Sequence, residues 1–252
     1  MNFLYEPSYD SPNLRGVNET QRPWNLINEI KSYSNINKTL LDIGCGTAFK
    51  LVPLSSLFNK IVGIDINQKM ALAANHLIKK NNIKNIKIIC CDSNQLAIDN
   101  QSFDIITCML SRWCLQEIVR ILKPNGIVII EHIGCADKKE LKLLFGQDQE
   151  GWRGQFIKYQ TDEYLSFFQE KFRFFFNSVS IRNGFWKTYY TEKGLLELLN
   201  FTPTIRNFDS KKDVAVLKNA YKIFKQPQGI ELTQNRILIN AQKLRNFKIS
   251  KS

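Results

Sequence analysis

The stretch Leu40-Leu41-Asp42-Ile43-Gly44-Cys45-Gly46-Thr47-Ala48 decides the fold of this chain. A short apolar run ends in a carboxylate, and two glycines follow, one residue apart. A second apolar run, Ile61 to Ile64, ends in Asp65. Glycines let a backbone turn tightly and approach a ligand closely, and a carboxylate at a strand tip can accept both hydrogens of a ribose diol. This spacing predicts a nucleotide-binding α/β domain.

The composition bounds the class of protein. The chain has 252 residues, of which 44% are apolar, so we expect one medium domain, or one domain with an added lobe. No apolar run is long enough to cross a bilayer. The segment Met1 to Glu6 lacks a charged stretch followed by an apolar core. We therefore expect no secretion signal, no membrane partner and a cytoplasmic location.

Cysteine usage and charge narrow the alternatives further. The six cysteines form no C-x-x-C pair, which favours reduced thiols; with two histidines besides, we expect no metal site. The formal net charge of +12 invites a nucleic-acid partner. The basic residues are nevertheless spread along the chain, and the chain is rich in Lys, Asn and Ile together. Charge alone therefore does not select an RNA-binding function.

The apolar pattern predicts how the chain is organised. Recurring apolar residues between Trp24 and Ile30 predict a short amphipathic helix. From Thr39 onward strands and helices alternate, as expected of a parallel sheet that is covered on both faces. The expected strands are 39–43, 61–65, 86–91, 103–109 and 126–132, and the expected helices are 48–58, 68–81 and 114–122.

The rhythm changes after about residue 135. We expect a strand over 172–181, a helix over 191–200 that Thr191 caps, a helix over 214–224 and a last strand over 236–241. The predicted division is 1–38 as a lead-in with a helix, 39–135 as a nucleotide-binding core, and 136–252 as a C-terminal part. This last part would carry the acceptor-side helices and the last strands of the sheet.

A third acid helps to identify the nucleotide. Asp92 ends the apolar run Ile86 to Cys91 and precedes Ser93. The glycine loop lacks the Gly-Lys-Ser/Thr ending of an ATP phosphate loop, and Phe49 stands where a dinucleotide fold wants a third glycine. Three acids at successive strand ends, with no lysine or arginine beside them, would repel pyrophosphate. They suit a cationic sulfonium that carries an amino group, a ribose and an adenine.

Five ordered motifs over about residues 39–133 carry a family resemblance: Asp42 to Thr47, Gly63 to Asp65, Cys91 to Ser93, Ser102 to Ile106, and Glu117 to Gly126. Together they resemble the class I S-adenosylmethionine-dependent methyltransferases. The resemblance implies a Rossmann-like α/β fold with a seven-stranded, mostly parallel sheet, helices on both faces and an antiparallel last strand. It also implies S-adenosylmethionine as cofactor and transfer of its sulfonium methyl group.

The resemblance further implies roles for individual residues. Asp42, Gly44 and Gly46 would border the methionine part of the cofactor, and Asp65 would hold the ribose hydroxyls. The full cofactor-binding set is Asp42, Gly44, Gly46, Asp65, Ile66, Asp92, Ser93 and Met109, with Asp92 and Ser93 facing the adenine and Met109 or Leu110 closing the pocket. From the residues alone, Asp42 could instead cap a turn, and Asp92-Ser93 could be a loop cap.

The sequence says less about the residues that would bind the methyl acceptor. Methyl transfer needs mainly alignment and exclusion of water, and no general base is evident. Candidates are Arg112 for an anionic acceptor, Trp113 for stacking an aromatic one, and His132 for acid–base work. Trp113 could equally pack against the helix that follows it. The catalytic residues therefore stay unassigned.

The acceptor itself remains open between a small metabolite and an RNA base such as guanine. The short link before Lys123-Pro124-Asn125-Gly126 and the segment Gly194 to Pro203 are similar to bacterial 23S ribosomal RNA guanine-N1 methyltransferases. The zinc module with which those enzymes begin has no counterpart, because residues 1–38 hold no cysteine. A binding module that keeps the cofactor pocket but has lost catalysis is the alternative function.

Overall fold

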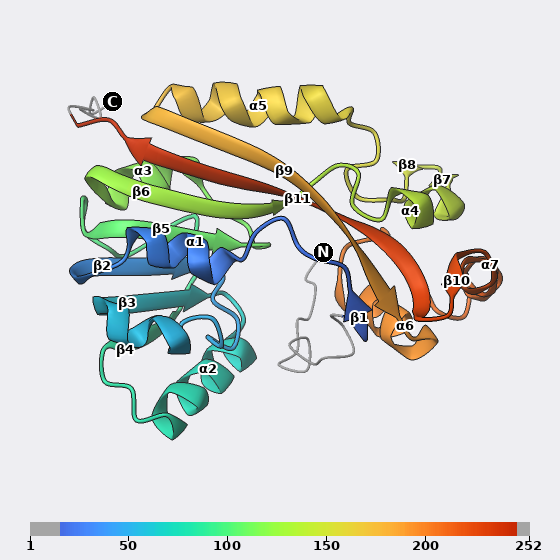
Figure 1. Ribbon diagram of the computed structural model, residues 1–252, viewed down its shortest axis with the longest axis horizontal. Helices are drawn as coiled ribbons and strands as arrows, with labels where there is room; N and C mark the ends of the chain where they lie inside the picture. The colour runs from blue at the N-terminus through green and yellow to red at the C-terminus, as the bar shows by residue number, and fades with distance from the viewer. Residues whose placement is uncertain (1–15, 246–252) are drawn as a thin grey trace. The chain divides into compact units, whose positions relative to one another are not determined.

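The computed structural model describes residues 16–245 (Figure 1). Residues 1–15 of the predicted lead-in, which include the segment Met1 to Glu6, lie outside the described residues. The chain divides into two compact units. We call residues Trp24–His132, Ser166–Arg182 and 237–245 the core unit, and residues 16–23, Ile133–Leu165 and Asn183–Arg236 the accessory unit. Strands β9 (Phe176–Tyr190) and β11 (Gly229–Lys243) contribute residues to both.

Five parallel strands form the centre of the core unit. Each pair of neighbours in the order β4-β3-β2-β5-β6 is parallel. Their bounds are β2 Asn35–Ile43, β3 Phe58–Asp65, β4 Ile86–Cys90, β5 Phe103–Met109 and β6 Leu122–Ile133. The sequence predicted all five, although β2, β3 and β6 begin three to four residues earlier than expected. Because the strands are parallel, the ends that carry the predicted site residues lie at one edge of the sheet.

The last strand reverses direction, as predicted. In the sheet order β11 lies between β6 and β9, and in Figure 1 its arrow runs opposite to those of both neighbours. The sheet has nine strands rather than the expected seven, because two short strands of the accessory unit, β1 (Asn18–Glu19) and β10 (Lys225–Gln226), also pair with it. The Rossmann-like, mostly parallel α/β fold is confirmed.

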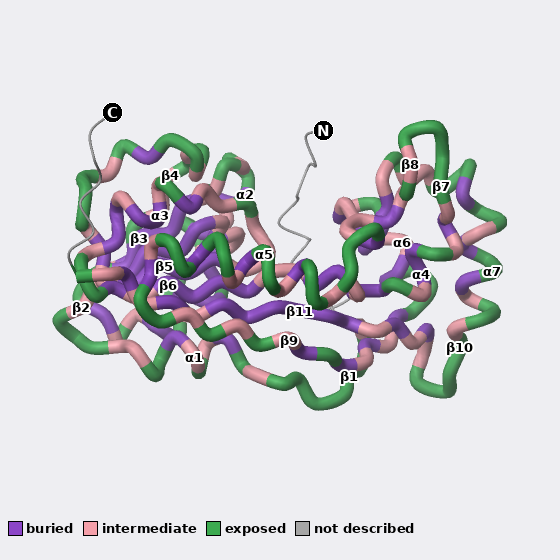
Figure 2. Tube along the Cα trace, turned by 90° about the horizontal axis from the view of Figure 1, so that it is seen from above, coloured by how far each residue is buried: buried purple, intermediate pink, exposed green. Residues whose placement is uncertain are grey.

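Helices bury both faces of the core sheet. Leu40 and Leu41 point to opposite faces, and both are fully buried. One face packs against α1 (Leu26–Tyr33), the 3-10 helix η3 (Val52–Leu57) and α2 (Gln68–Lys80) in a cluster that includes Ile30, Leu54 and Ala74. Figure 2 shows buried residues concentrated along the central strands. Helix α3 spans Leu115–Ile121, and α5 spans Thr161–Arg173.

One predicted helix is wrong. Residues 48–58 were expected to form a single helix, but turns lead from the glycine loop into the short η3, and Phe58 already begins β3. Ala48 has φ of +62°, a left-handed conformation that a right-handed helix excludes. Pro53 also lacks the N–H that a continuing helix would need. The loop therefore stays compact beneath the strand ends.

The accessory unit has a separate apolar core. Its helices are α4 (Lys139–Phe145), α6 (Glu192–Phe201) and α7 (Val214–Phe224), and a small hairpin joins β7 (Gln147–Asp148) to β8 (Gly151–Trp152). Buried residues of α4, α6 and α7 pack on β9 and β11. The predicted cap of α6 is confirmed, because Thr191 Oγ1 accepts a hydrogen bond from the Gly194 N–H at 2.9 Å.

Two boundaries in this half of the chain differ from those predicted. The expected strand over 172–181 is instead the end of α5 followed by β9, which continues to Tyr190. The last strand begins at Gly229 rather than Arg236 and ends at Lys243. Both strands are therefore longer than their apolar runs. No helix among the described residues is long and apolar enough to cross a membrane.

Candidate functional site

The glycine loop makes the tight turn that its sequence requires. Gly44 and Gly46 have φ of +69° and +56°, which glycine adopts without strain. A Cβ at Gly44 would lie 2.1 Å from Ser111 Oγ, so any side chain at this position would clash with Ser111. A Cβ at Gly46 would meet no atom within 4 Å. The loop backbone at Gly46 is therefore open to a ligand.

Asp65 ties this loop to the end of β3. Its Oδ2 accepts the Gly46 N–H and its Oδ1 accepts the Asn67 N–H, both at 2.9 Å. An ionised carboxylate offers about four acceptor positions, so one remains on each oxygen. The side chain is half-exposed, and the neighbouring Ile66 is 70% exposed. With respect to the described residues, Asp65 thus keeps two unused acceptor positions beside the exposed side chain of Ile66.

Asp42 is buried at the end of β2, where its oxygens have different surroundings. Oδ1 accepts a hydrogen bond from Thr107 Oγ1 at 2.7 Å. Oδ2 accepts none from the described residues, and the Lys50 ammonium lies 3.7 Å from it. The expectation that no lysine stands beside the three acids is therefore wrong for Asp42. Lys50 follows Asp42 on the same segment, and the left-handed turn at Ala48 lies between the two residues.

Asp92 and Ser93 form the loop after β4. Asp92 is exposed, and its Oδ1 accepts the Asn94 N–H at 2.9 Å. The Ser93 hydroxyl donates to the Arg112 carbonyl at 3.4 Å. Asp92 therefore caps its loop through Oδ1. The Cys91 N–H donates to the Asp65 carbonyl at 3.1 Å, which holds the ends of β3 and β4 together.

Met109 ends β5, and the backbone turns sharply after it. Leu110 has φ of +54°, a left-handed conformation that costs a leucine about 1–2 kcal/mol. The Leu110 N–H donates to the Glu131 carbonyl at 2.9 Å. Met109 and Leu110 are both half-buried. The strand register thus brings the whole predicted cofactor set to one edge of the core sheet.

The acceptor-side candidates lie in different environments. Trp113 is half-buried and lies 5.7 Å from Phe172 and 6.5 Å from His132, as measured between ring centroids. The Lys171 ammonium lies 5.0 Å from the centroid of the same indole. These contacts are with α5 and the end of β6, whereas the packing alternative named the helix that follows Trp113, which is α3. The stacking role of Trp113 stays a prediction. Arg112 is exposed.

His132 shares this aromatic cluster, and its ring centroid lies 5.2 Å from that of Phe168. The preceding residue, Glu131, is buried, and its carboxylate accepts the indole N–H of Trp24 at 2.9 Å. The sequence predicts no role for Trp24 beyond the apolar face of a short helix. The only available signal was an apolar helix face, which does not reveal a hydrogen bond to a residue more than one hundred positions away.

Neither thiol beneath the site is suited to nucleophilic chemistry. Burial, with the nearby carboxylates of Asp42 and Asp65, holds the pKa of Cys45 well above its usual range. Burial, followed by Asp42, raises the pKa of Cys108 to about 12. Both thiols are therefore protonated at neutral pH, and Cys45 serves as a small apolar residue under the loop.

Comparisons with known proteins agree on the family. A family model described as "Methyltransferase domain" matches residues 34–172. Malonyl-[acyl-carrier protein] O-methyltransferase of Buchnera aphidicola is 28% identical over 148 residues, covering 56% of this chain and 54% of the relative. Demethylmenaquinone methyltransferase of Lactobacillus johnsonii is 30% identical over 161 residues, covering 60% and 63%. The matches span about half to two thirds of the length of these two relatives.

A solved structure has the same fold. The crystal structure of YcgJ from Bacillus subtilis superposes with a TM-score of 0.62 over 86% of this chain and 97% of that protein, at 15% sequence identity. At this identity the likeness concerns the fold alone.

Proposed function

Because this chain belongs to the class I S-adenosylmethionine-dependent methyltransferases, through a methyltransferase domain over residues 34–172, we propose that it methylates a small-molecule acceptor. The observation that carries the proposal is the carboxyl edge of the core sheet. There Asp42, Asp65 and Asp92 end successive strands around a glycine loop that is open at Gly46.

The residues of this edge fit the cofactor. The open backbone at Gly46 leaves room where a side chain would otherwise stand. The buried Asp42 Oδ2 has no hydrogen-bond donor among the described residues, and an α-ammonium group would supply one. Lys50 offers a positive charge nearby for an α-carboxylate. The fit is thus to a ligand that carries both an amino group and a carboxylate at one end.

Asp65 would hold the ribose. Its two unused acceptor positions match the two hydroxyls of a ribose diol, while its bonds to Gly46 and Asn67 keep the carboxylate from turning. Exposed Ile66 would cover one face of the adenine, with Asp92 and Ser93 at its polar rim and Met109 near the reacting end. Bound S-adenosylmethionine supplies a methyl group that its sulfonium already activates.

The protein's own contribution is then alignment and exclusion of water. Trp113, Phe168 and Phe172 pack with His132 into an apolar cluster after the ends of β5 and β6. The half-buried Trp113 would offer an aromatic face to an organic acceptor, with the Lys171 ammonium beside it. His132 could accept a proton from an acceptor hydroxyl, a role that stays a proposal.

The names of two relatives support the proposal of a small-molecule acceptor. One is named as acting on malonyl-[acyl-carrier protein] and the other on demethylmenaquinone. An RNA acceptor stays a prediction that the net charge of +12 motivates.

The test uses the protein with S-adenosylmethionine labelled in its methyl group. It is incubated in parallel with a small-metabolite extract and with total RNA. We expect label to appear in the organic-soluble metabolites. Label in the RNA alone would refute the small-molecule acceptor, and turnover of neither substrate beside tight S-adenosylhomocysteine binding would favour the non-catalytic alternative.

A further inference from the structure

The accessory unit buries a lysine whose ammonium makes no hydrogen bond to the described residues. Lys142, on α4, is 0% exposed, and its ammonium donates to no acceptor in the part of the chain that the structure describes. An ammonium group can donate three hydrogen bonds, and burying it without acceptors is costly. Such a group calls for an explanation in terms of something that binds it.

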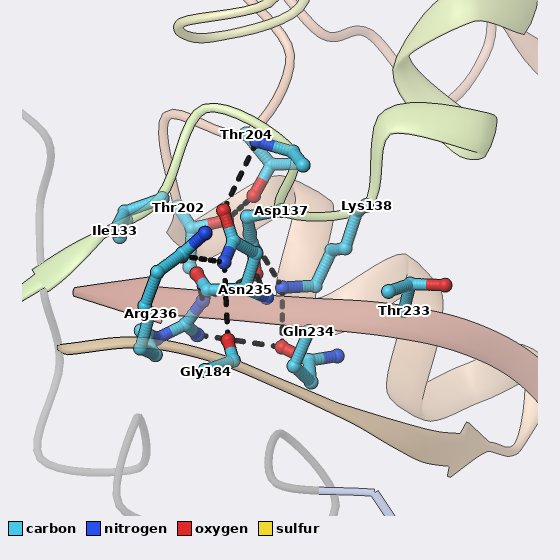
Figure 3. A network of polar contacts seen from close by, with 12 residues as sticks. Ile133, Asp137, Lys138, Gly184, Thr202, Thr204, Thr233, Gln234, Asn235 and Arg236 are labelled. Carbon is cyan, nitrogen blue, oxygen red and sulfur yellow. Dashed lines mark hydrogen bonds and ion pairs between the residues drawn. The ribbon is translucent and has the colours of Figure 1, made fainter. Parts of the chain in front are cut away.

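The accessory unit holds a dense polar network around Asp137 (Figure 3), and three of its charged groups, Asp137, Lys138 and Arg236, act electrostatically on Lys142. Asp137 Oδ2 accepts a hydrogen bond from the Lys138 ammonium at 3.0 Å, and Asp137 Oδ1 accepts one from the Arg236 guanidinium. Lys138 also donates to Gln234 Oε1 at 2.8 Å, and Arg236 Nη2 donates to the same oxygen at 3.3 Å. The two other cations of the network are therefore satisfied within it, and Lys142 is not.

The charges of this network do not balance. We call Lys138, Lys142 and Arg236 the basic cluster. Two carboxylates face it, Asp137 and Glu140, and the Glu140 carboxylate is already engaged by the Thr233 N–H. Among the described residues the cluster thus exceeds its counter-charges by one positive charge, and one monoanion would balance it.

Electrostatics leave Lys142 charged at neutral pH. Burial lowers the pKa of Lys142 to about 8, and the Asp137 carboxylate opposes this shift, while Lys138 and Arg236 add to it. The Cys135 thiol also faces the amine. Because the pKa stays above 7, most molecules keep an unpaired ammonium inside the accessory unit.

The chain covers Lys142 closely from one side. A Cβ at Gly154 would lie 2.6 Å from Lys142 Cβ, so a bare glycine backbone lies against the stem of the lysine. Gly154 is held there by a β-bridge to Ile205. The covering segment fixes the stem and thereby the direction of the ammonium.

We propose that the basic cluster is a binding site for the carboxylate group of a small organic acid, with Lys142 as the residue that donates to it. A carboxylate carries the single negative charge that the cluster lacks. A phosphate dianion fits less well, because its second negative charge would exceed the single positive charge that the basic cluster has in surplus. The proposed cofactor residues all lie in the core unit, so this site is a separate one and does not depend on the proposed function.

The test is calorimetric titration of the full chain with acetate, with acetamide as an uncharged compound of the same shape. We compare the wild type with Lys142→Met, which keeps the length of the side chain and removes the charge. Lys139→Met is the matched control, because Lys139 is the exposed lysine on the same helix. We expect Lys142→Met to weaken acetate binding by about tenfold or more, as loss of one charged hydrogen-bond donor predicts.

Four further results belong to the expectation. Lys139→Met binds acetate as the wild type does, and acetamide does not bind. Acetate binding to the wild type weakens about tenfold between pH 7 and pH 9, because most of the Lys142 amines have lost their proton at pH 9. Affinity for S-adenosylhomocysteine stays unchanged in Lys142→Met, which separates this site from the cofactor site.

Several outcomes would overturn the proposal. These are no acetate binding to the wild type, equal binding to Lys142→Met, or tighter binding of inorganic phosphate than of acetate. Far-UV circular dichroism verifies that the variant folds. If Lys142→Met does not fold, Lys142→Gln replaces it in the same titration, and unchanged acetate affinity in that variant would equally reject the site.

Discussion

Replacing Asp65 with alanine is expected to weaken binding of S-adenosylhomocysteine by about two to three orders of magnitude. Each carboxylate oxygen holds one backbone N–H at 2.9 Å and keeps one acceptor position for a ribose hydroxyl. A hydrogen bond to a charged group contributes about 1.5–3 kcal/mol, and the lower end applies because Asp65 is half-exposed. Two lost bonds then cost about 3–4 kcal/mol, and every 1.4 kcal/mol is about tenfold in Kd.

Isothermal titration calorimetry with S-adenosylhomocysteine measures this loss. Asp65→Asn is the informative partner variant, because it keeps one acceptor oxygen and removes the charge, and its affinity should fall between those of Asp65→Ala and the wild type. Asp104→Asn is the matched control. Asp104 also accepts a backbone N–H, from Thr39, and it pairs with Lys123, but it lies at the opposite edge of the sheet near the start of β5. This control should lose stability and keep its cofactor affinity.

The reasoning is refuted if a folded Asp65→Ala variant binds S-adenosylhomocysteine as tightly as the wild type. It is also refuted if Asp104→Asn weakens binding as much as Asp65→Ala does. The first result would mean that Asp65 serves the glycine loop and not the ribose. The second would mean that any loss of a carboxylate in the core unit disturbs the site.

Three further predictions concern the buried charges and the glycine loop. Lys142→Met should raise the free energy of unfolding by about 3 kcal/mol below pH 8, because the pKa of Lys142 falls from 10.5 to about 8 on folding. This gain should vanish as the pH rises towards 10.5, and urea unfolding at pH 7 and pH 10 would measure the difference. Asp137→Asn leaves the buried Arg236 guanidinium without its carboxylate and should cost about 3–5 kcal/mol, measured by thermal melting; an unchanged Tm would contradict the network. Gly44→Ala should destabilise the fold, because the added Cβ would clash with Ser111. Gly46→Ala should cost about 1–2 kcal/mol in stability and should also weaken cofactor binding, as measured by calorimetry. Equal cofactor affinity in Gly46→Ala and the wild type would contradict an open ligand site at Gly46.

The linkage behind the Lys142 prediction has a definite sign. Below pH 8 the amine is protonated in both states, and the folded state bears the full cost of burying the charge. Between pH 8 and 10.5 the unfolded state binds more protons than the folded state, so stability rises with pH in that window. A bound carboxylate would offset the same cost at neutral pH, which connects this prediction to the proposed acid site.

Local patterns identified the parallel strands because each is a short apolar run that ends in a turn signal. The same patterns failed at residues 48–58. There the apolar spacing favoured a helix, but a left-handed Ala48 and Pro53 interrupted it. The extension of β9 to Tyr190 was missed although its burial alternates, with Gly184, Trp186 and Thr188 buried. The alternation involves polar residues such as Thr188, which a search for apolar runs does not register.

From the sequence alone, the order of strands, the tight glycine turn and the carboxylates at the strand ends could be derived, because each depends on neighbours within a few residues. Three features could not be derived from it: the proximity of Lys50 to Asp42, the hydrogen bond from Trp24 to Glu131, and the charge imbalance around Lys142. Each depends on side chains that meet across the fold, and the cost or gain of a buried charge is set by groups that burial brings together. Tertiary structure alone decides which charges are paired.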